Sequence, residues 1–145
     1  MIAGLIIAAG KQSRFGDVTP KALCKLGNTT IAQHNVELLS TFCKPFIVVS
    51  NKNHHYFSEV FSEGQLIDVG EPGGGSGDAV YKALKLLDYD SVVVCWGDVI
   101  LTDKHIDYLK NTACNEGLLI PVRKELKPYV ALDYSFGAHF SKYKE

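Results

Sequence analysis

Residues 2–21, IAGLIIAAGKQSRFGDVTPK, decide how the rest of the chain can fold. The stretch opens with an unbroken run of apolar and small residues at 2–9. Such a run is too short to span a membrane and is typical of a strand buried on both faces of a parallel sheet. It stops at Gly10, where a polar loop begins. We therefore expect a first, central strand that ends directly in a functional loop.

The loop after this strand has the composition of a phosphate site. Lys11 and Arg14 supply positive charge beside the backbone N–H groups at the end of the strand, and both features attract phosphate. Lys21 follows the rigid Pro20 and is expected to face the same cleft as a further cation. The small residues before the loop leave room for a ligand to approach the backbone. The candidate phosphate-binding residues here are Ala8, Ala9, Gly10, Lys11, Gln12 and Ser13.

Two familiar phosphate-binding motifs do not fit this chain. A Walker loop requires a glycine five residues before the Gly-Lys pair, but Gly4 lies one residue too far from Gly10, and Gln12 occupies the Ser/Thr position. The dinucleotide fingerprint Gly-x-Gly-x-x-Gly is missing as well, even from the glycine cluster at 73–77. The sequence therefore excludes both of these motifs.

The remainder of the chain alternates between strand and helix patterns. This alternation predicts a three-layer α/β/α sandwich with a mostly parallel central sheet and right-handed crossovers. Thr29 and Thr30 are candidate caps for the first helix. The expected helices span residues 31–41, 54–61, 78–87 and 103–110; the expected strands span 46–49, 65–69, 91–96 and 117–122, with a hairpin at 129–132 and 138–140.

Size and composition restrict the function further. A chain of 145 residues suits one domain, and its net charge of −1 gives no reason to expect nucleic acid or an acidic membrane as a partner. No apolar run approaches the ~20 residues of a transmembrane helix. The four cysteines have no zinc spacing and are interpreted as free, mostly buried thiols of a cytoplasmic protein. His54 and His55 are adjacent and cannot converge on one metal, so we expect both to be solvated.

Three loops are expected at one edge of the sheet. In an open α/β sheet, ligands bind beyond the carboxyl ends of the strands. The loop after residues 2–9, the glycine loop at 70–77 and the Gly97-Asp98 pair after residues 91–96 all fall at that edge. Glycine loops often serve only as turns, and an Asp after a strand often caps a helix. The arrival of all three at one edge favours a ligand cleft.

The same three places resemble the nucleotidyltransferases of the sugar-nucleotide pyrophosphorylase type. That family opens with L-A-A-G-x-G-x-R-[FM]-G followed by P-K-x-L, which AAGKQSRFG at 8–16 and PKAL at 20–23 match, with Gln12 in place of the second glycine. GSGDA at 75–79 resembles the family's G-[TS]-[AG]-x-A helix start. VVVCWGD at 92–98 resembles its strand ending in Gly-Asp, and residues 128–137 resemble its P-Y-G-x-V-x-x-D hairpin.

The resemblance implies a reaction and a role for each matched residue. A phosphorylated acceptor would attack the α-phosphorus of a nucleoside triphosphate and release pyrophosphate. Arg14 and Lys21 would be catalytic, and Asp98 would hold Mg²⁺. Gly75, Ser76 and Gly77 would frame the nucleoside. The base stays open, and so does the acceptor: a sugar 1-phosphate is commonest in the family, while choline or methylerythritol phosphates serve close relatives.

Several alternatives stay open at this point. The family's domain continues past residue 145 to a second Mg²⁺ carboxylate, so the resemblance implies that 1–145 is an incomplete nucleotidyltransferase domain. We expect such a domain to bind the triphosphate but to transfer slowly or not at all. A non-catalytic nucleotide-binding module is the main alternative, and a homo-oligomer is also open. A flavodoxin-like or receiver-type domain would share the layer order but would not explain Arg14 and Lys21.

Overall fold

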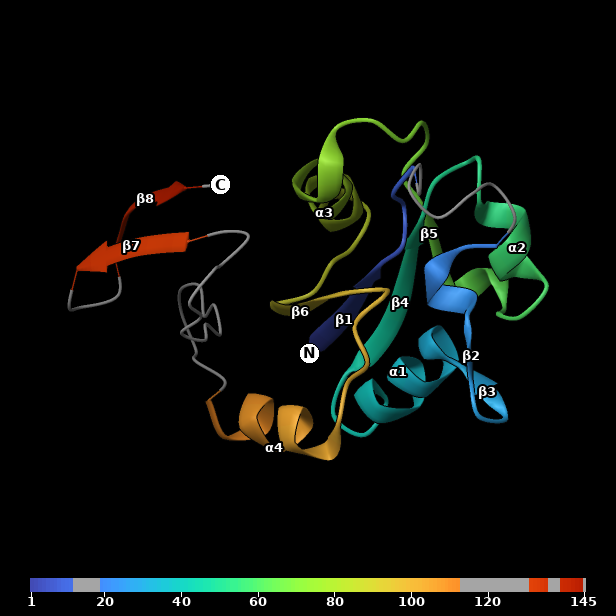
Figure 1. Ribbon diagram of the computed structural model, residues 1–145, viewed down its shortest axis with the longest axis horizontal. Coiled ribbons are helices and arrows are strands. Elements are labelled where there is room, and N and C mark those ends of the chain that lie inside the picture. The colour runs from blue at the N-terminus through green and yellow to red at the C-terminus, as the bar shows by residue number, and fades with distance from the viewer. Residues whose placement is uncertain (12–18, 113–130, 136–138, 145) are drawn as a thin grey trace. The chain divides into compact units, whose positions relative to one another are not determined.

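The computed structural model describes residues 1–11, 19–112, 131–135 and 139–144 (Figure 1). The chain divides into two compact units, Met1–Thr112 and Ala113–Glu145. The first unit contains the central sheet and the helices that cover it, and it is the unit that carries the candidate site. That residues 1–145 make one nucleotidyltransferase domain stays a prediction.

The sheet of the first unit has four parallel strands in the order β5-β4-β1-β6. The predicted parallel α/β fold is therefore confirmed. Because β1 lies between two partners, the apolar run at residues 2–9 is buried as expected from its composition. The strands are β1 (Ile2–Ile7), β4 (Lys44–Val49), β5 (Leu66–Asp68) and β6 (Ser91–Trp96).

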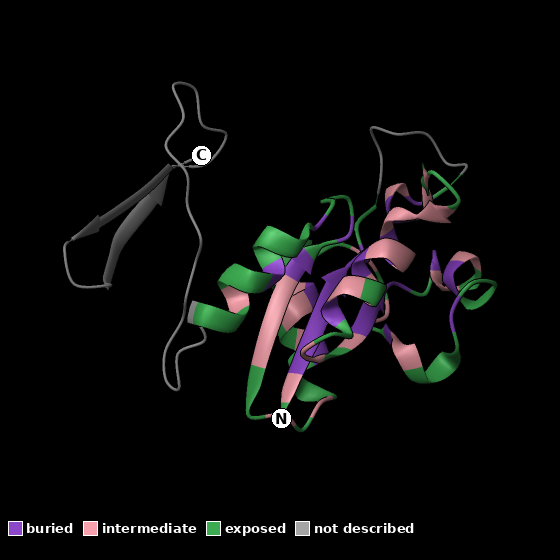
Figure 2. Cartoon of the chain, turned by 90° about the horizontal axis from the view of Figure 1, so that it is seen from below, coloured by how far each residue is buried: buried purple, intermediate pink, exposed green. Residues whose placement is uncertain are grey.

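Side chains of β1 alternate between two cores, one on each face of the sheet. Leu5 and Ile7 belong to the core that includes Ala79 and Ala83, whereas Ile6 belongs to the core on the opposite face. This period of two is the geometry of a strand buried on both sides. Figure 2 shows the buried residues concentrated in the central strands. Helix α3 covers one face and helix α1 the other, which gives the three predicted layers (Figure 1).

The helices of the first unit are α1 (Ile31–Leu39), α2 (His54–Ser58), α3 (Gly75–Lys85) and α4 (Asp103–Thr112). The prediction of Thr30 as a cap is confirmed. Its hydroxyl accepts a hydrogen bond from the Gln33 backbone N–H, and the Gln33 side chain accepts one from the Thr30 backbone N–H. This reciprocal capping box fixes where α1 begins. The short strands β2 (Lys25–Leu26) and β3 (Thr29–Thr30) form a separate antiparallel pair before it.

Most element boundaries differ from the prediction by one to three residues, and two of these differences have a clear physical reason. Helix α3 begins at Gly75, three residues before the predicted start at Asp78, because its first turn is built from glycines that carry no apolar pattern. Strand β4 begins at Lys44 and includes Pro45, which pairs with Gly4. Proline is tolerated near the start of a strand, so this residue does not exclude the pairing.

The second unit contains an antiparallel hairpin of β7 (Ala131–Ser135) and β8 (His139–Lys144). Its pairing has an irregularity between Asp133 and Tyr134. The predicted hairpin is therefore present, with both strands displaced toward the C-terminus. The predicted strand at 117–122 lies outside the described residues. Within the described part of the chain, no helix is both long and apolar enough to cross a membrane.

Candidate functional site

A cleft of about 370 Å³ opens at the carboxyl edge of the sheet in the first unit. Its walls come from the ends of β1, β5 and β6 and from the N-terminus of α3, which is where ligands bind in open α/β sheets. Its lining residues are Ile7, Ala8, Ala9, Gly10, Lys11, Lys21, Ala22, Val69, Glu71, Pro72, Gly73, Gly75, Ser76, Asp78, Ala79, Trp96, Gly97 and Asp98.

Most of the predicted site residues that the structure describes lie in this one cleft. They are Ala8, Ala9, Gly10, Lys11, Lys21, Gly75, Ser76 and Asp98. Gly77 lies in the first turn of α3 but is not part of the cleft wall. Gln12, Ser13 and Arg14 lie outside the described residues. Three sequence motifs separated by up to 88 positions (10 to 98) therefore contribute to one concave surface.

Close packing at Gly97 brings the ends of β1 and β6 together. The Gly97 N–H donates to the Ile7 carbonyl at 2.8 Å, continuing the ladder by one rung. A Cβ atom at this position would lie 3.0 Å from the Ile7 oxygen and 3.1 Å from the Ala22 Cβ. A side chain at this position would therefore push its neighbours apart by a few tenths of an ångström. This close packing sets the place of Asp98 beside Lys21.

Lys21 and Asp98 form an ion pair across the mouth of the cleft. The Lys21 Nζ lies 3.8 Å from the Asp98 Oδ2, and the two side chains are 41% and 49% exposed. Lys21 begins a 3₁₀ turn, Lys21–Leu23, directly after Pro20. An ion pair this exposed contributes on the order of 0–1 kcal/mol. Both charged groups can therefore exchange their mutual contact for a ligand at little cost.

The glycine loop faces the phosphate loop from the other side of the cleft. The Lys11 side chain lies close to Gly73. A Cβ atom added to this glycine would be 3.9 Å from the Lys11 Cε. At Gly74 an added Cβ would lie 2.4 Å from the Asp78 side chain, so a larger residue would displace that carboxylate. Asp78 pairs with Lys82 at 2.8 Å. Asp78 also lies in the first turn of α3, where the positive end of the helix dipole stabilises its negative charge.

Asn35 supports the loop that follows Asp98, and no sequence pattern indicates this role. It is fully buried on α1, where its Nδ2 donates to the Val99 carbonyl at 2.7 Å and its Oδ1 accepts from the Leu101 N–H at 3.0 Å. These bonds fix the backbone immediately after Asp98. An isolated Asn within an amphipathic helix gives no indication of partners 64 and 66 residues away.

Trp96 lines the cleft, although the sequence assigned it no role. It is the last residue of β6 and the only tryptophan of the chain. Its surface is 54% exposed, although it precedes the buried Gly97. An exposed indole in the wall of a cleft offers a flat apolar surface to a ligand.

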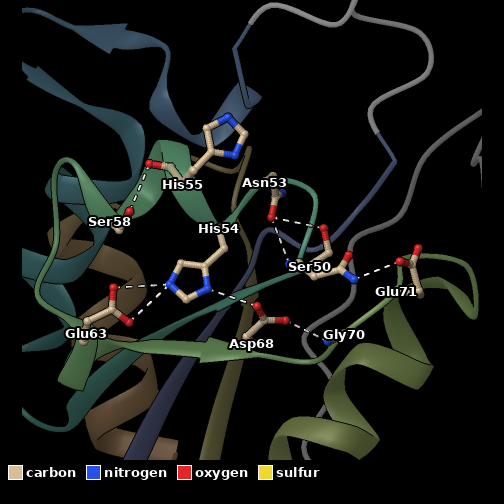
Figure 3. Close-up of polar contacts among 10 residues, drawn as sticks. Ser50, Asn53, His54, His55, Ser58, Glu63, Asp68, Gly70 and Glu71 are labelled. Atoms are coloured by element: carbon tan, nitrogen blue, oxygen red, sulfur yellow. Dashed lines mark hydrogen bonds and ion pairs between the residues drawn. The ribbon is translucent and has the colours of Figure 1, made fainter.

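The turn after β4 supports the glycine loop. The Asn51 N–H donates to the Gly70 carbonyl at 3.0 Å, and the Asn51 side chain donates to the Glu71 Oε1 at 2.8 Å. Lys52 lies 3.5 Å from the Glu71 Oε2. The Asn51 hydrogen bond first, and then the charge of Lys52, lower the pKa of Glu71. Glu71 is therefore a carboxylate at the start of the glycine loop (Figure 3).

His55 is exposed, and His54 is partly exposed and has two acidic partners that the sequence did not predict. The His54 Nδ1 lies 3.0 Å from the Asp68 Oδ2, and its Nε2 lies 3.2 Å from the Glu63 Oε2 (Figure 3). The other Asp68 oxygen accepts from the Gly70 N–H at 2.8 Å. The hydrogen bond with Asp68 raises the pKa of His54, partial desolvation opposes this rise, and Glu63 adds to it. His54 thus joins α2 to the strand that leads into the glycine loop.

We expect His54→Gln to destabilise the protein in acid and not in alkali. Because the folded-state pKa of His54 is raised, its stabilising effect is complete below the unfolded pKa and is lost as the pH rises through the folded value. The Tm difference from wild type is therefore expected to be largest below the unfolded pKa of about 6.5 and to shrink as the pH rises above that value. His55→Gln serves as the matched control. A difference that does not change with pH would contradict the charged pairing.

The described residues contain no cluster of three or more His, Cys, Asp or Glu side chains that could hold a metal by themselves. Asp98 is one of three carboxylates in the cleft wall, together with Glu71 and Asp78. Cys24, Cys43 and Cys95 are free thiols, as predicted; Cys95 is buried, and the other two are partly buried. Burial raises the pKa of Cys43 to about 11 and that of Cys95 to about 12, so neither is a thiolate at neutral pH.

The chain is similar to several nucleotidyltransferases. It is 34% identical over 99 residues to the bifunctional protein GlmU of Buchnera aphidicola, covering 66% of this chain and 21% of that protein. It is 30% identical over 107 residues to the bifunctional enzyme IspD/IspF of Campylobacter jejuni, covering 72% and 28% respectively. The chain thus spans about a quarter of the length of these relatives.

The structure of the bifunctional IspDF from Campylobacter jejuni aligns with a TM-score of 0.59 and 28% identity, over 76% of this chain and 30% of that one. The model of the MobA-like NTP transferase domain matches residues 4–144, which include the cleft and both units. This match agrees with the resemblance found in the three loop motifs. The chain belongs to the family of MobA-like NTP transferase domains.

Proposed function

We propose that the cleft binds a nucleoside triphosphate and transfers its nucleoside monophosphate to a phosphorylated acceptor, with release of pyrophosphate. One observation carries the proposal: Lys11, Lys21 and Asp98 line the same cleft at the carboxyl edge of the sheet. Family membership supports nucleotidyl transfer in general. A cytoplasmic location and a lack of nucleic-acid partners, both expected from composition, complete the proposal.

The chemistry requires alignment and charge neutralisation more than proton transfer. A phosphate oxygen of the acceptor forms a bond to the α-phosphorus, and the bond from that phosphorus to the bridging oxygen of pyrophosphate breaks. The leaving pyrophosphate keeps the electron pair. The nucleophile is already an anion, so no general base is needed. The protein contributes mainly by positioning and electrostatic stabilisation.

Each described cation of the cleft has a place in this reaction. Lys11 and the N–H groups of the loop after β1 hold the β- and γ-phosphates, where negative charge develops on the leaving group. Lys21 contacts the α-phosphate and the attacking phosphate. The same role as for Lys11 is proposed for Arg14 from the sequence alone. Gly75 and Ser76 lie in the cleft wall beside the proposed nucleoside position.

Asp98 is the residue proposed to hold Mg²⁺. Mg²⁺ in phosphoryl-transfer sites binds through one or two carboxylates together with substrate phosphates and water. A half-exposed carboxylate facing a cleft with two lysines fits this kind of site. When bound, the metal would neutralise phosphate charge and polarise the α-phosphate. Asp98 would orient it, and Lys21 would be released from the ion pair to contact phosphate.

The finer proposal concerns the acceptor. We propose a sugar 1-phosphate, on the strength of the sequence resemblance to pyrophosphorylases. A phosphorylated alcohol presents the same attacking group, a phosphate monoester, and differs only in the part that contacts the outer cleft. The two classes are therefore distinguished by assay and not by the phosphate chemistry.

Trp96 provides a direct test of nucleotide binding. Because it is the only tryptophan and lines the cleft, Mg²⁺–triphosphate is expected to change its fluorescence in a saturable titration. The base that binds most tightly should also raise Tm most, since a ligand that binds only the folded state stabilises it. Trp96→Phe should abolish the fluorescence signal. Saturable thermal stabilisation with no change in Trp96 fluorescence would place the nucleotide elsewhere.

Pyrophosphate release tests the transfer itself. The chain is incubated with each nucleoside triphosphate, Mg²⁺ and a panel of sugar 1-phosphates and phosphorylated alcohols. Release that depends on both the triphosphate and one acceptor supports the proposal and identifies the acceptor class. Tight triphosphate binding without release for any acceptor would contradict transfer by residues 1–145.

A further inference from the structure

We propose that Asn53 is a positioning residue for the phosphate loop, one that fixes the peptide group at which β1 turns into the loop. The inference deepens the proposed function and rests on it for the identity of the ligand. Asn53 lies in the turn between β4 and α2. It is 8% exposed, so it acts through the backbone of the loop and does not contact a ligand itself.

All polar atoms of the Asn53 side chain are hydrogen-bonded. The Nδ2 donates to the Ala8 carbonyl at 2.7 Å. The Oδ1 accepts from the Ser50 N–H at 2.8 Å and from the Ser50 hydroxyl at 3.1 Å, as Figure 3 shows. Ser50 is 1% exposed, so these bonds are made in a buried environment. An unpaired group there would cost about 1–3 kcal/mol.

The Asn53 amide occupies the place of one rung of the parallel ladder. The Ala8 N–H donates to the Val48 carbonyl at 2.8 Å, and the next bond in a parallel pattern would run from the Ser50 N–H to the Ala8 carbonyl. Instead, the Asn53 side chain lies between these two groups and bonds to both. The pairing of β1 with β4 therefore ends at this point, and the Ala8 carbonyl accepts its hydrogen bond from the Asn53 side chain instead.

Holding the Ala8 carbonyl also sets the direction of the following N–H group. The peptide unit is planar and trans, so the Ala9 N–H points opposite to the Ala8 carbonyl, away from Asn53. Ala9 and Gly10 line the cleft. A backbone donor whose direction is fixed before the ligand arrives needs no reorganisation on binding. Asn53 thus preorganises the start of the phosphate loop.

The decisive variant is Asn53→Asp. The introduced carboxylate can still accept both bonds from Ser50, but in its ionised form it cannot donate to the Ala8 carbonyl. We expect the KM for the triphosphate to rise about 10- to 100-fold, which is the range found when a residue that orients a metal ligand is removed. The KM for the acceptor should change much less. Asn28→Asp, in an exposed turn, is the matched control.

A pH profile separates positioning from general structural damage. Protonation of the introduced carboxyl restores a donor for the Ala8 carbonyl, so triphosphate affinity of Asn53→Asp should recover as the pH falls, relative to wild type. Amide hydrogen exchange without ligand gives a second readout. Ala9 and Gly10 should exchange faster in the variant, while amides in the middle of β1 stay protected. Asn53→Ser, which keeps a hydroxyl donor and acceptor, serves if Asn53→Asp does not fold.

The outcomes distinguish this inference from the proposed function. If wild type binds no triphosphate, the proposed function fails, and the exchange of Ala9 and Gly10 still tests Asn53. If Asn53→Asp and Asn53→Ser lower Tm but leave both triphosphate affinity per folded molecule and the exchange of Ala9 and Gly10 unchanged, then Asn53 is only structural and the inference is overturned.

Discussion

Lys21→Ala is expected to slow nucleotidyl transfer by about 10²–10³-fold, comparable to the loss of one preorganised donor at a developing charge. Lys21 lines the cleft and contacts Asp98 at 3.8 Å, so its charge lies where two phosphates must approach each other. Removing this charge leaves their repulsion uncompensated. The rate of pyrophosphate release at saturating substrates is the quantity to measure.

Stability should change little in the same variant. The Lys21–Asp98 pair is exposed and contributes at most ~1 kcal/mol, which corresponds to a Tm shift of no more than a few degrees. Lys25→Ala is the matched control because Lys25 is exposed and lies outside the cleft wall. A Lys21→Ala protein that transfers as fast as the Lys25→Ala protein would show that Lys21 has no role in the reaction.

The central strand and the position of the cleft could be predicted because their signals are local. The apolar run at residues 2–9 has one stable placement, between two neighbouring strands with a core on each face. Once β1 is central, the carboxyl ends of its neighbours must meet at the same edge. Lys21 and Asp98 could therefore be placed near each other from their order in the chain, although their direct contact could not.

The start of α3 could not be predicted in the same way. Helix patterns are recognised from apolar periodicity, and the glycines at 75 and 77 have none and disfavour helix on their own. In the structure the helix begins at Gly75, which adopts a φ of 78° in the left-handed region and not a helical value. This conformation is easy for glycine and costly for other residues. The start of α3 at Gly75 is therefore understood from the structure and could not be predicted from the sequence pattern.

His54, Asn35 and Asn53 show what sequence patterns leave out. Each is polar, and each finds its partners through the fold: His54 on Asp68, Asn35 on Val99 and Asn53 on Ala8. The separations in sequence are 14, 64 and 45 residues. No periodicity encodes such contacts. The motifs identified the groups that could contact a ligand, whereas the supports behind them became evident only from the buried hydrogen bonds.

Asp98→Asn is expected to lower transfer by at least about 10²-fold and to raise the Mg²⁺ concentration needed for half-maximal rate. The substitution keeps the shape of the side chain but removes the charge that a hard cation prefers. The loop itself should persist, because Asn35 fixes its backbone through Val99 and Leu101. The experiment is a Mg²⁺ titration of pyrophosphate release, with the exposed Asp88→Asn as the control.

The double variant decides how Lys21 and Asp98 act. If each matters only because it holds the other, removing both should cost no more than removing one, since the pair is already lost in either single variant. If Lys21 contacts phosphate while Asp98 holds the metal, the two losses should approximately multiply, and only Asp98→Asn should shift the Mg²⁺ titration. A Mg²⁺ response equal to wild type in Asp98→Asn, combined with a lower Tm, would make Asp98 a structural residue of its loop.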